Sequence, residues 1–179
     1  MEIKQLIKEL NKLTKAEAEK IAYYFNHGGQ FSSDLFDEPI RLDDSLHNLK
    51  SLWGRRGVYL FKAIEDIELD NSAVGKWNRI NGASFVWWKP QPLTIGDCFY
   101  IGKSDKSLYS RIKQHYSAER NGTSALLLGH QNRIIMRDKL ECIAFPVKRI
   151  YTKDEYKMLL KAVESHLQQN LKQKCGVKN

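Results

Sequence analysis

The stretch "IGDCFYIGKS", residues 95–104, decides the fold because its two halves favour different structures. Its last letters, GKS, end a phosphate-binding P-loop of the pattern G-x-x-x-x-G-K-[ST], and that pattern would place a glycine at position 97. The residue there is Asp97, and the bulky apolar letters CFYI follow it where such a loop needs conformational freedom. Its part DCFYIGK (97–103) instead predicts a β-strand with alternating side chains. The predicted faces are Cys98, Tyr100 and Gly102 on one side, and Phe99 and Ile101 on the other.

Three more segments have the composition of strands. GVYLFKA (57–63) and LECIAFPVKRI (140–150) are rich in β-branched and aromatic residues. SFVWWKP (84–90) predicts a shorter strand that ends at its proline, and Pro146 marks an edge or a bulge in the segment 140–150.

Helical periodicity dominates the two ends of the chain. Apolar residues of the segment 3–12 lie on one helical face, and Thr14 with Glu17 has the spacing of a capping box that starts a second helix through Phe25. We therefore expect an N-terminal helical hairpin packed on the core, with a DNA-reading helix-turn-helix as the alternative. Further helices are predicted over 106–117, over most of 124–140 and over 152–173.

The order of these elements predicts an α+β fold, in which a small, central, mostly antiparallel β-sheet is flanked by helices. Residues 1–50 form a helical N-terminal extension, and residues 51–179 form the main domain. An insert at 64–96 separates the first two strands of the core sheet.

Composition limits the functional classes. The chain has 179 residues, of which 42% are hydrophobic, but its apolar runs are too short to cross a bilayer. We therefore expect a soluble, cytoplasmic protein without a membrane partner. Three widely spaced cysteines without a CxxC pair argue against both disulfides and a cysteine-zinc site. The net charge of +8 attracts polyanions such as nucleic acid, although a merely basic soluble protein has the same composition.

Two tripeptides at strand ends share a tyrosine and a glycine. GVY (57–59) opens one predicted strand, and YIG (100–102) closes another. Arg111 and His115 follow at spacing i, i+4 and so share a helix face, while Glu164 lies on the last predicted helix. Together these residues resemble the GIY-YIG nuclease family, with GVY in place of its first tripeptide and YIG intact as its second.

The resemblance implies a GIY-YIG-type endonuclease that hydrolyses DNA phosphodiester bonds with one divalent cation, Mg²⁺ or Mn²⁺. It implies that Glu164 holds the metal and that Arg111 binds the scissile phosphate, for which its planar fork is suited. Tyr59 is our preferred general base, although a tyrosine with an ordinary pKa of about 10 needs nearby cations to lower that pKa. Tyr100 and His115 would then orient the water or relay its proton.

Other assignments follow from position. Lys103 and Lys113 are expected nucleic-acid contacts because they follow the YIG strand closely. The tail asparagine of the family has no counterpart at its usual place, which is Gly176 here, so Asn179 or Asn170 must serve.

Each of these residues also has an ordinary structural explanation. Tyr59 and Tyr100 suit any amphipathic strand, and the arginine and histidine suit a solvated helix face. Glu164 is more informative, because it borders the apolar stripe of its helix, where an unpaired carboxylate is costly and a cation would offset the cost. The rival acid, Glu155, lies in the first turn of that helix, where the helix dipole is a sufficient explanation.

The length of the insert between the two tripeptides indicates which branch of the family the chain resembles. Tyr59 and Tyr100 are 41 positions apart, much farther than in compact members, and this favours the restriction-type branch, which tolerates longer insertions. The insert also carries tryptophans interleaved with cations, a composition that suits stacking on bases as well as an ordinary core. These residues are Trp77, Trp87 and Trp88, with Lys76, Arg79 and Lys89.

Three functions therefore remain open. The leading hypothesis is a DNA endonuclease, and cutting both strands of a palindrome would favour a homodimer by symmetry. The second is a catalytically inactive nucleic-acid-binding module that retains the nuclease fold. The third is a basic protein-interaction domain. The sequence decides neither the target sequence nor DNA against RNA.

Overall fold

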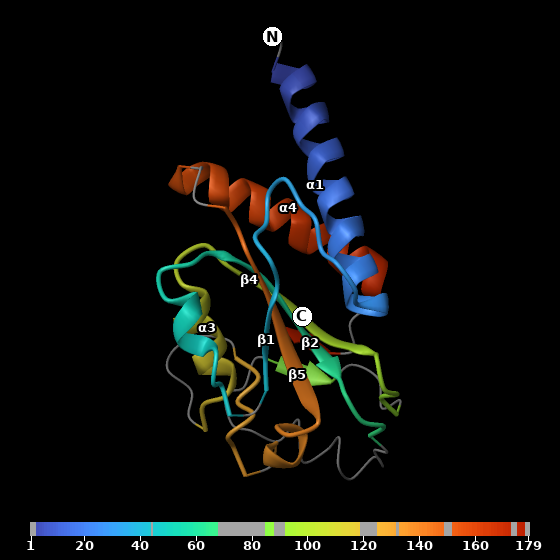
Figure 1. Ribbon diagram of the computed structural model, residues 1–179, viewed down its shortest axis with the longest axis vertical. Helices are drawn as coiled ribbons and strands as arrows, with labels where there is room; N and C mark the ends of the chain where they lie inside the picture. The colour runs from blue at the N-terminus through green and yellow to red at the C-terminus, as the bar shows by residue number, and fades with distance from the viewer. Residues whose placement is uncertain are drawn as a thin grey trace.

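The computed structural model describes residues 3–43, 45–67, 85–87, 92–118, 125–131, 133–148, 152–172 and 175–177. In these ranges the protein has an α+β fold, in which three α-helices accompany a four-stranded antiparallel sheet packed against helices (Figure 1). The predicted fold class is confirmed at this level. Each helix of the described ranges is too short or too polar to cross a lipid bilayer.

The main sheet has the strand order β1-β5-β2-β4, and every neighbouring pair is antiparallel. Its strands are β1 (Ile40–Leu42), β2 (Gly57–Ala63), β4 (Cys98–Ser104) and β5 (Leu140–Pro146). The strands predicted at 57–63, 97–103 and 140–150 are confirmed, whereas β1 is too short to show a period in the sequence. A separate antiparallel pair joins β3 (Phe85–Trp87) to β6 (Cys175–Val177).

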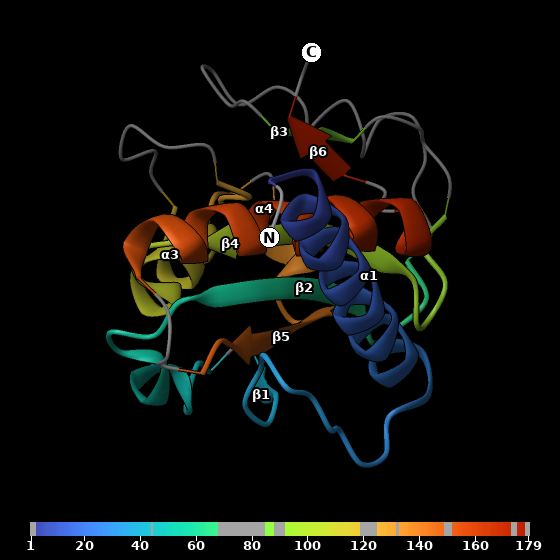
Figure 2. The same ribbon diagram turned by 90° about the horizontal axis from the view of Figure 1, so that it is seen from above.

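Helices cover both faces of the main sheet. Helices α1 (Ile3–His27) and α4 (Lys153–Leu171) pack on one face, and α1 lies across α4 (Figure 2). Helix α3 (Leu108–His115) and the short 3₁₀ helix η1 (Leu49–Leu52) pack on the other face. The predicted start of α4 is confirmed, because the hydroxyl of Thr152 and the carboxylate of Glu155 form a reciprocal capping box.

A register shift in β4 changes which of its side chains share a face. The pairing of β4 with β2 slips between positions 61 and 62, which leaves Phe99 as an extra residue of a bulge. Phe99 and Tyr100 therefore both pack on the α3 side, while Cys98 and Ile101 pack on the α4 side. The predicted alternation is wrong for Cys98 and Phe99, because no simple period survives an inserted residue.

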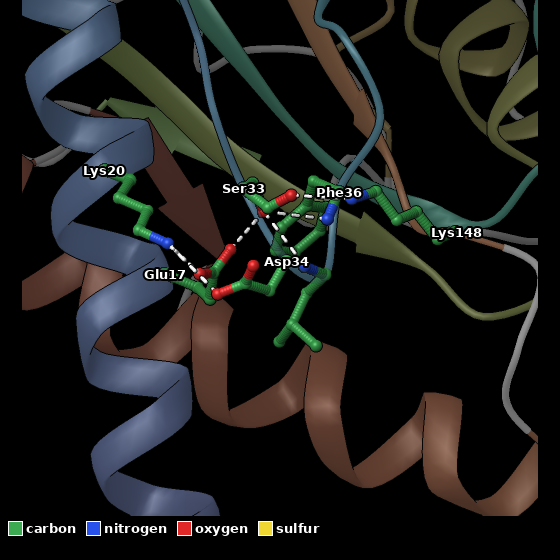
Figure 3. Close-up of polar contacts among 7 residues, drawn as sticks. Glu17, Lys20, Ser33, Asp34, Phe36 and Lys148 are labelled. Atoms are coloured by element: carbon green, nitrogen blue, oxygen red, sulfur yellow. Dashed lines mark hydrogen bonds and ion pairs between the residues drawn. The ribbon is translucent and has the colours of Figure 1, made fainter.

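The predicted N-terminal hairpin is wrong, because α1 is one continuous helix of 25 residues. Thr14 does not cap a second helix: its hydroxyl donates to the Leu10 carbonyl, 3.0 Å away, in the preceding turn. Glu17 points into the protein instead of back along the chain, where it accepts hydrogen bonds from the Ser33 hydroxyl and, at 2.6 Å, from Lys20 Nζ (Figure 3). Thr14 and Glu17 thus have the spacing of a capping box, but their side chains form other hydrogen bonds and the helix continues through both residues.

The prediction of a mostly helical segment over 124–140 is also wrong. In its described part, the only helical piece is the 3₁₀ helix η2 (Ile134–Met136), and Leu127 has a left-handed φ of 53°. Buried Arg133 explains the turn, because its Nη1 donates to the Leu126 carbonyl at 2.5 Å and holds the segment folded back on itself. The run of leucines is apolar because this loop is buried, not because it forms a helical stripe.

Candidate functional site

Gly102 and Tyr59 lie directly opposite each other on β4 and β2. The Tyr59 side chain is fully buried, and its phenol passes over the glycine. A Cβ atom at position 102 would lie 2.5 Å from both Cζ and Oη of Tyr59 and 2.9 Å from Cε1 of Tyr100. The glycine of the YIG tripeptide is therefore needed to make room for the tyrosine of the GVY tripeptide.

His115 makes two hydrogen bonds that define its protonation. The backbone N–H of Leu126 donates to Nδ1 at 3.0 Å, so in the neutral ring the proton resides on Nε2. Nε2 lies 2.8 Å from Oη of Tyr59 and donates to it. Burial lowers the pKa of His115 well below its ordinary value, and the nearby charge of Arg111 lowers it further, so the ring is neutral at physiological pH.

Arg111 provides the second donor to the same phenol. Its Nε lies 3.2 Å from Oη of Tyr59, and its Nη1 donates to Oε1 of Gln114 at 3.3 Å. Burial lowers the pKa of Arg111, but the contacts with Tyr59 and Tyr100 more than reverse that effect, and the guanidinium stays charged. Oη of Tyr59 is thus an acceptor for one neutral and one cationic N–H group.

The pKa of Tyr59 reflects two opposed influences. Burial raises it well above the ordinary value and proximity to Tyr100 adds to the rise, while Arg111 lowers it. The ring centroid of Tyr100 lies 6.2 Å from that of Tyr59 and 5.2 Å from that of His115. The site is therefore a compact aromatic cluster in which the Tyr59 phenol ionises only when a nearby cation stabilises its phenolate.

Glu164 and Lys103 approach this cluster from the other face of the sheet. Lys103 pairs with Val58, which packs on the α4 side, and β4 is the edge strand of the main sheet. Burial raises the pKa of Glu164, whereas the charges of Lys103 and Arg111 lower it. No side chain in the described ranges forms a hydrogen bond or a close ion pair with Glu164.

The structure brings together Tyr59, Tyr100, Arg111 and His115. Among the described residues, Glu164 forms no hydrogen bond or close ion pair with these four and is influenced only by the charges of Lys103 and Arg111. Lys113 is separate: it lies on the exposed side of α3, where its Nζ is 5.8 Å from the ring centroid of Tyr109. Asn170 is exposed near the end of α4. Asn179, Trp77 and Trp88 lie outside the described residues, as does the side chain of Trp87.

Gln114 and the Leu126 amide are functional neighbours that sequence reasoning missed. The spacing i, i+3 from Arg111 could have identified Gln114 as a partner on the same helix face. Nothing in the sequence could have identified the amide, because a backbone N–H carries no residue signature and reaches His115 through a loop.

Comparisons of the chain with protein-family models, curated proteins and solved structures found no match.

Proposed function

We propose that this protein is a divalent-metal-dependent endonuclease of the GIY-YIG type that hydrolyses DNA phosphodiester bonds. One observation carries the proposal: a buried tyrosine accepts N–H groups from an arginine and a neutral histidine, over the glycine of the YIG tripeptide. An isolated amphipathic strand needs neither the paired donors nor the glycine. The arrangement is the one expected of a group that takes up a proton in the reaction.

Tyr59 is the proposed general base for the attacking water. Two N–H donors favour its phenolate, and one of them carries a full positive charge, while burial opposes ionisation. His115 holds its own proton on Nε2, so it supports the phenol as a donor and does not compete for the proton of the water. Deprotonation of Tyr59 is therefore the step on which the rate should depend.

Arg111 is the proposed ligand of the scissile phosphate. Its guanidinium has more N–H donors than the contacts with Tyr59, Tyr100 and Gln114 use, so N–H groups remain for a phosphate while Nε holds the base. A phosphate placed there would lie close to both the base and the carboxylate of Glu164. Lys103 adds a second positive charge near the same carboxylate.

Glu164 fits the metal that the resemblance implies. Its carboxylate offers hard oxygen atoms and has no partner among the described side chains. The described ranges contain no cluster of three or more acidic, histidine or cysteine residues, and Mg²⁺ needs none, because it keeps several waters when held by one or two carboxylates. When bound, the cation would neutralise charge that develops on the phosphate and on the leaving oxygen.

The raised pKa of Tyr59 favours one alternative, a nucleic-acid-binding module that keeps the fold without activity. Incubation with supercoiled plasmid and either Mg²⁺ or Mn²⁺ separates the two functions. We expect nicked or linear product from the wild type and a loss of about a hundredfold to a thousandfold in rate for Arg111→Ala. Plasmid that is bound but never cut with either ion would establish the alternative.

A further inference from the structure

A hollow lies on the outer side of α3, away from Tyr59. Its volume is about 520 Å³, which is the size of a small-ligand site. The described residues that line it include Tyr109, Lys113, Gln114 and Arg137. Among the described residues this lining contains two cations and no acid, so the hollow favours an anionic occupant.

An exposed tryptophan stands beside this hollow. Trp53 follows η1 immediately and is 70% exposed, although a large aromatic side chain in a folded domain is usually covered. Its ring stacks at a tilt on Tyr109, with centroids 4.9 Å apart. Lys113 Nζ lies 5.8 Å from the Tyr109 centroid. Tyr109 of the lining thus lies between the Trp53 ring and the Lys113 ammonium, and most of the indole surface is open to solvent.

The hollow and the candidate active site are linked by one residue of α3, Gln114. Gln114 lines the hollow and also accepts the hydrogen bond from Arg111 Nη1. An α-helix is only about 10 Å across with its side chains, so a nucleic-acid strand with one phosphate at Arg111 passes the hollow with a neighbouring nucleotide.

We propose that this hollow binds an unpaired nucleotide of the substrate strand, with its base stacked on Trp53 and its phosphate held by Lys113 and Arg137. The base must be unpaired, because a base inside a duplex already stacks on both faces and cannot offer one to an indole. Stacking on an aromatic ring accepts any base, and the two cations neutralise the strand without reading its sequence. The link to cleavage rests on the proposed function, and it assigns a substrate with a single-stranded segment at the cut.

The test is a binding titration in EDTA, which prevents cleavage. A 20-nucleotide oligothymidine and a duplex of equal length are compared at one salt concentration, using wild type, Trp53→Ala, Trp53→Phe and Tyr23→Ala. Tyr23 is the matched control, because it is 65% exposed and stacks on His27 with centroids 4.5 Å apart, in a different part of the chain.

We expect Trp53→Ala to weaken single-strand binding roughly tenfold and to leave duplex binding unchanged. Trp53→Phe should restore most of the affinity, and Tyr23→Ala should change nothing. An equal loss for both nucleic acids, or no loss for either, would overturn the proposal. Preferential binding of an acidic peptide, tested with polyglutamate and lost in Trp53→Ala, would overturn it as well, because the occupant would then be a protein.

The same variants distinguish this proposal from the proposed nuclease function. If Trp53→Ala loses single-strand affinity while the wild type cuts no DNA with Mg²⁺ or Mn²⁺, the hollow is a binding site and the nuclease function is wrong. If the wild type cuts DNA and Trp53→Ala binds single strands normally, the nuclease function stands and the hollow is not its strand-binding site.

Discussion

Two carboxylates on neighbouring helices, Glu17 and Glu164, differ in whether nearby side chains form hydrogen bonds with them. Glu17 of α1 is 1% exposed and accepts hydrogen bonds from the Ser33 hydroxyl and from Lys20 Nζ (Figure 3). Glu164 of α4 is partly buried, and no described side chain forms a hydrogen bond or close ion pair with it, although Lys103 and Arg111 lie near enough to lower its pKa. Burial alone therefore does not indicate function. The informative property is a partly buried acid whose oxygen atoms are not used by its neighbours.

Glu17 belongs to an anchor for α1. Ser33 also accepts the backbone N–H groups of Leu35 and Phe36, at 3.1 and 2.8 Å, and Lys148 Nζ donates to the Ser33 carbonyl at 2.7 Å. Each polar group there has a partner on the protein, so the cluster ties the helix to the segment that enters the sheet. Such a cluster stabilises the fold and leaves nothing for a ligand.

The largest effect should come from Glu164→Gln, because it removes the proposed metal ligand and keeps the volume of the side chain. We expect plasmid cleavage with Mg²⁺ to fall by about a thousandfold, with single-strand binding in EDTA retained. The matched control is Asp154→Asn, an exposed acid in the first turn of α4. Full activity in Glu164→Gln would contradict the assignment of the metal.

Glu17→Ala should lower the stability of the fold and leave cleavage unchanged, which is the opposite of the expectation for Glu164→Gln. Glu17→Ala leaves the partly buried Ser33 hydroxyl and the Lys20 ammonium without their acceptor, and we expect the free energy of unfolding to fall by about 2–3 kcal/mol in urea titrations. Glu19→Ala, an exposed acid of the same helix, serves as control and should change stability by less than about 0.5 kcal/mol. Cleavage by the folded fraction of Glu17→Ala should be normal, and a specific loss of activity would place Glu17 in the site.

The dependence of cleavage on pH should identify the base. The pKa of Tyr59 lies above its ordinary value, so only a small fraction is phenolate at neutral pH, and that fraction rises about tenfold per pH unit below the pKa. Single-turnover rates with Mg²⁺ between about pH 6 and 9 should rise with this slope. Tyr59→Phe should lower the rate about a hundredfold and leave a residual rate without this slope, whereas a flat profile in the wild type would exclude Tyr59 as the base.

The smallest expected effect concerns the stability of Glu164→Gln. Because burial raises the folded-state pKa of Glu164, the wild type loses stability as pH rises from the unfolded-state pKa, 4.5, toward the folded-state pKa, and the loss persists above it. Glu164→Gln lacks this penalty, so without metal its melting temperature should exceed that of the wild type at pH 7 and equal it below pH 4.5. Mg²⁺ should raise the melting temperature of the wild type only. A variant less stable than the wild type at pH 7 would show that Glu164 has a structural partner.

The sequence predicts the elements with long, clear periods and the residues whose chemistry is in their side chains. The strands around Tyr59 and Tyr100 and the start of α4 belong to this group. The predicted hairpin fails because Thr14 and Glu17 can satisfy their oxygen atoms within or beyond one helix as well as at a cap. The predicted alternation of β4 fails at Phe99 because an inserted residue is visible only in the pairing with β2.

The candidate site likewise has features that the sequence predicts and features that it does not. The tyrosines, Arg111, His115 and Glu164 can be identified by residue type and spacing, but the direction of the His115 proton cannot, because it depends on a backbone amide. Trp53 escapes sequence reasoning because a tryptophan beside a strand usually belongs to a core, and only its 70% exposure shows that it does not.

The loop at 126–128 determines which nitrogen of the neutral His115 ring carries the proton. It is tied to His115 twice, through the Leu126 N–H on Nδ1 and through the Leu128 N–H on the His115 carbonyl, 2.7 Å away. If the loop opens, Nδ1 loses its donor, the neutral imidazole becomes free to exchange tautomers, and the phenol of Tyr59 loses a guaranteed proton donor. The exchange rate of the Leu126 amide hydrogen would therefore report how persistently the loop holds the proton of His115 on the nitrogen that faces Tyr59.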